Sequence, residues 1–299
     1  MRLVTFRRTG TRAGDPARAG ALVHDGAYVL DLALAEPGLP SAVVAILEGG
    51  PAALERARAA VARPAPEALL PLADVVLDAP VPRPGKVVCI GYNYLGHAHG
   101  DGAGADEPLP ERPDVFVKTG NTIVGPDVPV VVPRESDEVD YEAELAVVIG
   151  TRARRVSVDR ALEHVAGYSV FDDVSARDWQ RRGSQWALGK SFDGFGPFGP
   201  ALVTADEVGD PQTLDVELAV NGRVTVRSST ARMIFPVADL VAYVSEVMTL
   251  EPGDVVATGT PQKLPDALAL GRWLRPGDRV DITISRVGTL STPFVADAG

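Results

Sequence analysis

The stretch between residues 137 and 150 constrains the fold most tightly, because it begins acidic and ends in an unbroken apolar run. We expect a strand here that is half-buried at its start. Since side chains alternate along a strand, Asp140, Glu142 and Glu144 would point to the same face. Carboxylates crowded on one face repel each other, and a hard divalent cation such as Mg2+ or Mn2+ between them would relieve that repulsion. A solvated acidic strand start is the alternative interpretation, and a second acidic pair at residues 172–173 favours the metal.

Length and charge narrow the class of protein. With 299 residues and a mass of 31.4 kDa, the chain can bury a large core, as one large domain or as a small and a large one. The net charge of -11 argues against nucleic acid and anionic membranes as partners. We find no apolar run as long as a membrane span, and expect no secretory signal. The one cysteine, Cys89, fits a reducing compartment, so we expect a cytoplasmic protein.

Residues 1–80 are predicted to form a small N-terminal α+β module. An Asp25-Gly26 turn between two apolar runs predicts a hairpin, and two short helices are expected after it. The proline-rich segment at residues 80–84 can continue neither a helix nor a central strand. We therefore place a boundary there, with a larger domain at residues 81–299.

The larger domain is predicted to be mixed α/β and rich in strands, without regular alternation of strands and helices. This pattern indicates a folded-over mixed sheet rather than a doubly wound one. Asn221-Gly222 predicts a second hairpin, and a helix is expected at residues 158–165. The glycine-rich run at residues 194–199 formally matches a dinucleotide-binding fingerprint. We reject that function because prolines break any helix after it and no strand runs directly into it.

A cluster of polar and aromatic residues follows the predicted buried strand that ends at Gly91. Tyr92 and Asn93 come at once, and His97 and His99 follow. Strand ends of this kind often carry functional sites. One histidine acting as a general base, with the other exposed, suits a hard-metal site better than a histidine metal pair.

Other polar side chains are candidates for binding an anionic substrate. Lys118 stands alone in an apolar strand, where it could hold an anionic group or pack its stem while its head reaches water. Arg177 and Gln180 are three residues apart and share one face of a predicted helix. The polar loop at residues 100–112 is predicted to be either a lid or a surface insertion.

Five ordered blocks in the larger domain carry a family resemblance. They read KVVCIGYNYLGHA (86–98), DYEAELAVVIG (140–150), FDDVSARDWQ (171–180), KSFDGFGPFGP (190–200) and PGDVVATGTP (252–261). Over about residues 86–292 the chain resembles the fumarylacetoacetate hydrolase family, especially its bacterial two-module members of the 2-hydroxyhepta-2,4-diene-1,7-dioate isomerase and acylpyruvase-like types. The first eighty residues resemble the smaller, variable N-terminal module of such members.

The resemblance implies a rolled β-sandwich catalytic domain, usually a homodimer, that binds Mg2+ or Mn2+ and acts on 2-oxo or 1,3-dicarbonyl acids. The metal ligands would be Glu142, Glu144 and Asp173, with Asp140 beside them or at the strand entry. The general base would be His97. The implied residues around the substrate are Lys118, Arg177, Gln180, Thr260 and the catalytic Lys190. Tyr92 is expected to bind the variable part of the substrate and contribute to specificity.

Three functions are compatible with this set of residues. The first is C–C bond hydrolysis or decarboxylation of a 2-oxo or 1,3-diketo acid, where Lys118 and Lys190 add positive charge as negative charge grows on a metal-polarised substrate. The second is a keto–enol isomerase, tautomerase or dehydratase on the same scaffold. The third is a catalytically weakened protein that binds 2-oxo acids, and the complete set of polar residues speaks against it.

Two positions depart from the family pattern. Many members that cleave C–C bonds carry a Glu three residues after the histidine, where this chain has Gly100. Either Asp101 or an acid at residues 106–107 replaces it, or the chain does not activate water in this way, which favours isomerase, decarboxylase or dehydratase chemistry. The family usually has a Gly-Val-Gly type turn at residues 262–264, where this chain has Gln-Lys-Leu.

Overall fold

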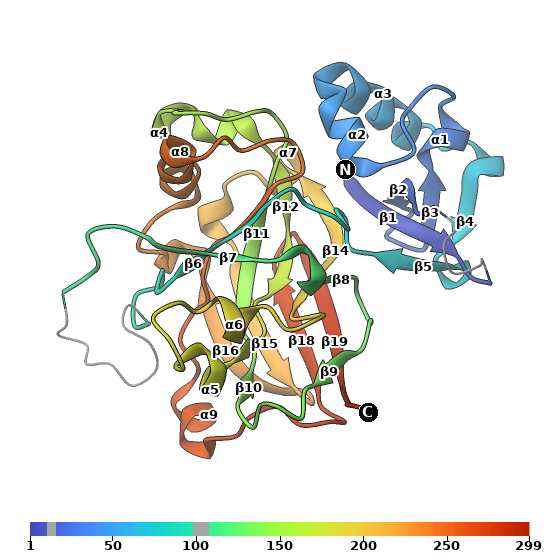
Figure 1. The fold of residues 1–299 in the computed structure, drawn as a ribbon. Coiled ribbons are helices and arrows are strands. Elements are labelled where there is room, and N and C mark those ends of the chain that lie inside the picture. The colour runs from blue at the N-terminus through green and yellow to red at the C-terminus, as the bar shows by residue number, and fades with distance from the viewer. Residues whose placement is uncertain (11–15, 98–107, 299) are drawn as a thin grey trace.

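The computed structural model describes residues 1–10, 16–97 and 108–298 of the chain (Figure 1). Its strands are β1 (Arg2–Arg8), β2 (Arg18–Val23), β3 (Tyr28–Asp31), β4 (Leu69–Pro71), β5 (Val75–Asp78), β6 (Val87–Gly91), β7 (Asp114–Lys118), β8 (Ile123–Val124), β9 (Val130–Val132), β10 (Val139–Asp140), β11 (Ala143–Ile149), β12 (Val165–Asp172), β13 (Ser175–Ala176), β14 (Gly196–Thr204), β15 (Asp215–Val220), β16 (Arg223–Ser229), β17 (Val255–Ala257), β18 (Arg279–Ile284) and β19 (Gly288–Ala296). The largest sheet follows the order β4-β3-β2-β1-β14-β12-β11-β17-β6-β7, with β5 on β1 and β8 on β14. A five-stranded sheet has the order β16-β15-β18-β19-β9, and β10 pairs with β13.

The helices are short, apart from one in each part of the chain. They are α1 (Leu32–Ala35), α2 (Val43–Glu48), α3 (Gly50–Ala62), α4 (Val158–Ala161), α5 (Arg177–Gln180), α6 (Ala187–Lys190), α7 (Ala205–Val208), α8 (Val237–Val247) and α9 (Pro265–Leu270). Among the described residues, we find no helix with the length and apolar character needed to cross a bilayer. The observed mixture of strand-rich sheets and few helices confirms the predicted fold class.

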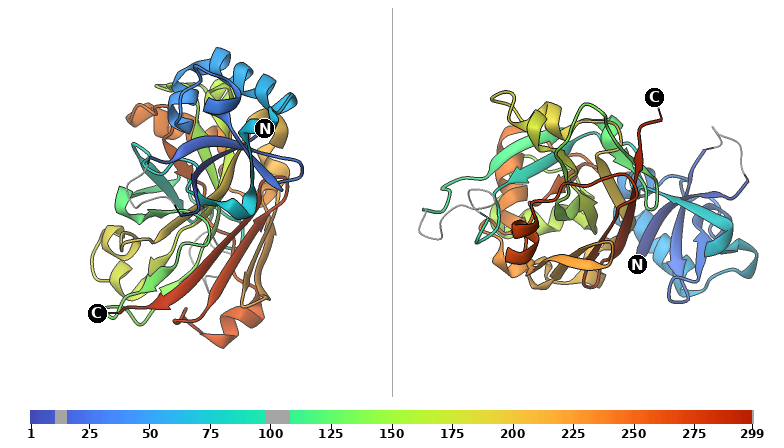
Figure 2. Two further views of the ribbon diagram at one scale, coloured as in Figure 1. Left: turned by 90° about the vertical axis from the view of Figure 1, so that its right-hand side faces the viewer. Right: turned by 90° about the horizontal axis from the view of Figure 1, so that it is seen from below.

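The N-terminal part has the predicted α+β content, and it lies to one side of the larger part (Figure 2). Its hairpin is confirmed, because β2 pairs with β3 across a turn in which Asp25 and Gly26 both have positive φ. The main sheet continues through it: β1 pairs with β14, and Leu3 lies opposite Leu202. Both parts therefore share one sheet and contribute buried side chains to one apolar cluster.

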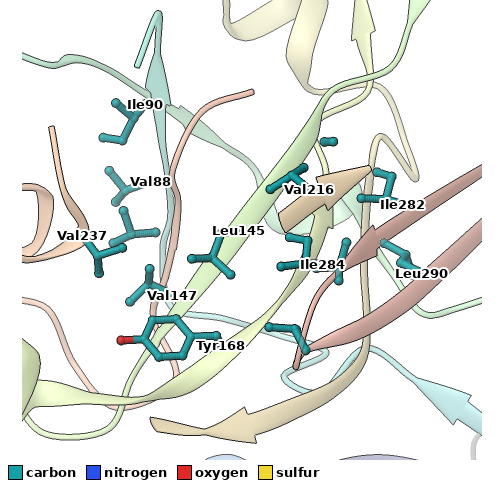
Figure 3. Close-up of a cluster of buried hydrophobic side chains, with 14 of the residues drawn as sticks. Val88, Ile90, Leu145, Val147, Tyr168, Val216, Val237, Ile282, Ile284 and Leu290 are labelled. Carbon is teal, nitrogen blue, oxygen red and sulfur yellow. The ribbon is translucent and has the colours of Figure 1, made fainter. Parts of the chain in front are cut away.

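The core of the larger part lies between the main sheet and the five-stranded sheet. Leu145 and Val147 of β11 face Val216, Ile282 and other residues of the second sheet (Figure 3). Burying such side chains stabilises the fold by roughly 1.5–3 kcal/mol for each residue. Helix α8 covers the same cluster from another side through a buried apolar face. The packed core fixes the ends of β11 and β12, which carry the acidic residues.

The prediction of one continuous acidic strand was wrong, because β10 ends at Asp140 and β11 begins at Ala143. A carboxylate replaces the strand ladder at the break. The backbone N–H of Glu142 donates to Asp172 Oδ1 at 3.1 Å, and the N–H of Asp173 donates to the Glu142 carbonyl. The break separates Asp140 from the two glutamates while keeping the glutamates together.

The helix predicted at residues 158–165 is also shorter than expected. Helix α4 ends at Ala161, a 3-10 turn follows, and β12 already begins at Val165. Gly167 lies inside β12, where a Cβ would stand 2.0 Å from the Val203 carbonyl oxygen. The close approach of β14 explains why a glycine is needed at this position.

Candidate active site

Three buried carboxylates meet where β11 begins and β12 ends. The two strands are antiparallel with Ala143 opposite Asp172, so Glu142 and Glu144 lie beside Asp173. One carboxylate oxygen from each residue lies within 4.8 Å of the others, and all three side chains are buried. The structure thus brings together the three residues predicted as metal ligands.

Two buried lysines pair with this cluster. Lys190 Nζ lies 2.7 Å from Glu142 Oε2 and 2.7 Å from Asp173 Oδ2, and Lys118 Nζ lies 2.5 Å from Asp173 Oδ1. Lys190 also stands 4.9 Å from the centre of the Phe116 ring. Burial lowers the pKa of Lys190, but the charges of Asp173 and Glu142 outweigh burial and raise it, so the ammonium stays charged.

The pKa values of Glu142 and Glu144 are shifted in opposite directions. Burial raises the pKa of Glu142, yet the charges of Arg177 and Lys190 outweigh burial and hold it well below its usual range. Burial and the charges of Asp173 and Glu142 raise the pKa of Glu144 well above its usual range. A further positive charge is therefore needed to keep Glu144 ionised. A set of three carboxylate ligands suits Mg2+ or Mn2+. The residues present fit such an ion.

Asp140 lies outside the cluster and joins two cations. Arg177 donates to Asp140 Oδ2 from Nε and Nη2 at 3.0 and 2.9 Å, and also to Glu142 Oε1 at 2.6 Å. Lys263 Nζ lies 2.6 Å from Asp140 Oδ1. Arg177 Nη1 also donates to Gln180 Oε1 at 2.9 Å, in agreement with the shared helix face predicted for that pair. Asp140 thus holds Arg177 in place beside the cluster.

A cavity of about 580 Å³ opens over these groups, at the end of the molecule where α5, α6, α9 and β10 gather (Figure 1). The predicted site residues that line it are Tyr92, His97, Glu142, Glu144, Arg177, Gln180, Lys190 and Thr260. Lys118 and Asp173 are not among the described residues that line it. Instead, the fully buried Lys118 ammonium donates to Asp173 and to the Val174 carbonyl, from behind the cluster.

One wall of the cavity is aromatic. Trp186 meets Tyr92 and Phe116 edge to face, with 5.3 Å between ring centres in each pair. Gly91 allows this arrangement, because a Cβ there would stand 2.7 Å from the indole ring. Trp186 and Lys263 also line the cavity and were not predicted as site residues, although the departure from the family pattern at residues 262–264 includes Lys263.

His97 lines the cavity with 8% of its surface exposed. Its ring is tilted against Tyr92 at 6.3 Å between centres. The Gly259 N–H donates to Glu144 Oε2 at 3.0 Å and fixes that carboxylate near Thr260, the next residue. The predicted second histidine, His99, lies outside the described residues, as do Gly100, Asp101 and the acids at 106 and 107 proposed to replace the missing glutamate.

Comparisons with known proteins identify the family. A family model described as fumarylacetoacetate (FAA) hydrolase C-terminal matches residues 86–295. The Bos taurus protein described as oxaloacetate tautomerase FAHD2A, mitochondrial, is 45% identical over 297 residues, which cover 99% of this chain and 92% of the relative. Among solved structures, the fumarylacetoacetate hydrolase of Exiguobacterium antarcticum has a TM-score of 0.81 and 34% identity, covering 99% of this chain and 100% of that one. The 5-carboxymethyl-2-hydroxymuconate delta-isomerase of Mycobacterium smegmatis has a TM-score of 0.76 and 34% identity, covering 100% of both chains. The chain therefore belongs to the fumarylacetoacetate hydrolase family of enzymes.

Proposed function

We propose that this enzyme is a divalent-metal-dependent tautomerase that interconverts the enol and keto forms of oxaloacetate or a closely similar 2-oxo diacid. The observation that carries the proposal is a cavity in which the buried carboxylates Glu142 and Glu144 lie together with the cations Lys190 and Arg177. The similarity to an oxaloacetate tautomerase over nearly the whole chain favours this reaction, the second of the three functions derived from the sequence.

In this proposal Glu142, Glu144 and Asp173 hold Mg2+ or Mn2+. When bound, the ion would supply Lewis-acid polarisation of the substrate's 2-oxo group. Arg177 and Gln180, on one face of α5, orient the neighbouring carboxylate through planar donors, a geometry that suits carboxylate recognition.

The proton transfers fall to the remaining polar residues. In the enol-to-keto direction a proton leaves the hydroxyl on carbon 2 and a proton is added at carbon 3, so composition and charge are unchanged. His97 exchanges one of these protons with the substrate, as a general acid and base. Lys190 places a fixed positive charge where the enolate oxygen develops negative charge.

The test follows loss of the enol absorbance of oxaloacetate in the presence of purified, metal-loaded protein. The proposal predicts a metal-dependent acceleration over buffer containing the same metal. Enol decay at the buffer rate, in protein that binds the metal, would contradict the proposal.

The second candidate function is C–C bond hydrolysis or decarboxylation of a 2-oxo or 1,3-diketo acid, supported by the likeness to a solved fumarylacetoacetate hydrolase. A panel of oxaloacetate and acylpyruvates, with products identified by NMR, separates the two candidates. Tautomerisation leaves the carbon skeleton intact, whereas hydrolysis or decarboxylation yields two fragments. The homodimer and the cytoplasmic location stay predictions, and sedimentation tests the first.

A further inference from the structure

A smaller cavity of about 90 Å³ adjoins the main cavity, and the proposed reaction of oxaloacetate does not require it. Four residues line both spaces: Tyr141, Ala267, Arg272 and Trp273. Tyr141 directly precedes the predicted metal ligand Glu142, and consecutive Cα atoms are about 3.8 Å apart. The smaller cavity, which we call the side compartment, therefore lies near the carboxylate cluster.

The side compartment is built between α9, at the lower end of the molecule in Figure 1, and the hairpin of β15 and β16. The Leu264 N–H, just before α9, donates to the Thr225 carbonyl oxygen of β16 at 2.8 Å. Arg223 of β16 also pairs with Asp266 of α9 at 2.8 Å. These contacts tie α9 to β16 and thereby fix two walls of the side compartment.

The lining of the side compartment suits an apolar group. Its apolar and aromatic residues are Tyr141, Val220, Ala267, Trp273 and Leu274. Among the charged residues of the lining, Arg223 pairs with Asp266. Arg272 pairs with the buried Asp278, which also accepts a hydrogen bond from Asn221 at 2.7 Å. Since these charges are already paired within the protein, the surface left for a ligand is mainly apolar.

The space available is larger than oxaloacetate needs. The main cavity of about 580 Å³ has the size that proteins use for drug-sized ligands, whereas oxaloacetate has a chain of only four carbons. The side compartment adds room for about three carbons, because a water molecule, which is similar in size to a methylene group, takes up about 30 Å³. A longer 2-oxo acid would occupy both spaces.

We propose that the side compartment binds the apolar tail of a 2,4-dioxo acid larger than oxaloacetate, such as an acylpyruvate with a short alkyl chain. The inference rests on the proposed function, because it takes the 2-oxo end of the substrate to lie at the carboxylate cluster. It makes Val220 a residue that sets substrate preference. Val220 lines the side compartment and is not among the described residues that line the main cavity.

The experiment measures how tightly the metal-loaded protein binds two acids that differ only in the length of the tail. Acetopyruvate ends in a methyl group, and butanoylpyruvate carries two further methylene groups. Moving two methylene groups from water into an apolar space predicts about tenfold tighter binding of butanoylpyruvate, as measured by calorimetric titration. Where an acid is turned over, its KM takes the place of the dissociation constant. Equal affinity of the unaltered enzyme for both acids would overturn the proposal.

Val220→Phe fills the side compartment from the hairpin side, and Val224→Phe is its matched control. Both residues are half-buried valines of the same hairpin, and Val224 is not among the described residues that line either cavity. In Val220→Phe the preference for butanoylpyruvate should fall below about twofold, while the affinity for acetopyruvate should change less than about twofold. Val224→Phe should keep the preference of about tenfold, and thermal unfolding of both variants compares their structural effects.

A preference that persists in Val220→Phe, or one that is lost equally in both variants, would also overturn the proposal. Enol–keto conversion of oxaloacetate is measured in the same samples. Absence of that conversion would contradict the proposed function, whereas the two dissociation constants would still test the side compartment.

Discussion

Replacing Gly259 with alanine should disturb the backbone hydrogen bond to Glu144 without changing a charged residue. Gly259 has a φ of +93°, and its N–H donates to Glu144 Oε2. An added Cβ would stand 2.9 Å from Asn93 Cβ and 3.0 Å from the Ile90 carbonyl oxygen. Asn93 cannot move aside easily, because its amide makes hydrogen bonds to the backbone of Thr258 and Phe235.

The magnitude follows from these contacts. The positive φ costs about 1–3 kcal/mol for a residue with a Cβ, and overpacking adds about 1–3 kcal/mol. Displacing the Gly259 N–H also weakens a hydrogen bond to a charged group, worth about 1.5–3 kcal/mol. We therefore expect a Gly259→Ala variant that unfolds at lower urea concentration and binds Mg2+ or Mn2+ about tenfold or more weakly.

Gly277→Ala separates strain from crowding. Gly277 has the same φ of +93°, but a Cβ there would meet no atom of the described residues within 4 Å. This control should lose only the strain contribution and keep full metal affinity, as measured by urea unfolding of the metal-free protein and by calorimetric titration. Equal stability of the two variants, or unweakened metal binding in Gly259→Ala, would refute the reasoning.

Two further variants test the charges of the site. Lys190→Met leaves Glu142 and Asp173 without a shared ammonium, which should destabilise the metal-free protein by about 3–5 kcal/mol and lower turnover about a hundredfold or more without weakening metal binding; turnover within tenfold of the unaltered enzyme would count against a catalytic Lys190. The pKa of Glu142 is lowered from 4.5 in the folded protein, so the stability that it contributes is present above pH 4.5 and is lost as the pH falls below it. Glu142→Gln should therefore make the free energy of unfolding of the metal-free protein fall less steeply at low pH, as measured by urea unfolding between about pH 3 and 7. An equally steep fall in the variant would show that other groups dominate there.

Features with local causes could be predicted from the sequence. The turn at Asp25-Gly26 and the turn at Asn221-Gly222 both carry the positive φ values that their residue types favour, and both hairpins are confirmed. The two glutamates of the carboxylate cluster lie two residues apart beside an apolar run, so their shared location follows from short-range periodicity.

Features that depend on distant residues could not be predicted in this way. The break before β11 is formed by the Asp172 carboxylate, which lies thirty residues further along the chain than Glu142. Pairing of β1 with β14 joins residues 2 and 203, so the predicted boundary near residue 80 divides one continuous sheet. Lys118 lies behind the carboxylate cluster, whereas Lys190 lines the cavity. This difference between two buried lysines likewise depends on packing.

Metal binding to Glu144→Gln, with enol–keto conversion of oxaloacetate measured in the same samples, tests the central claim most directly. The substitution keeps the volume of the side chain and the Gly259 contact while removing one negative charge from the cluster. We predict one Mn2+ per chain in the unaltered enzyme, and loss of both the ion and the metal-dependent conversion in the variant. Unchanged Mn2+ affinity in Glu144→Gln would contradict the assignment of the carboxylate cluster as the metal site.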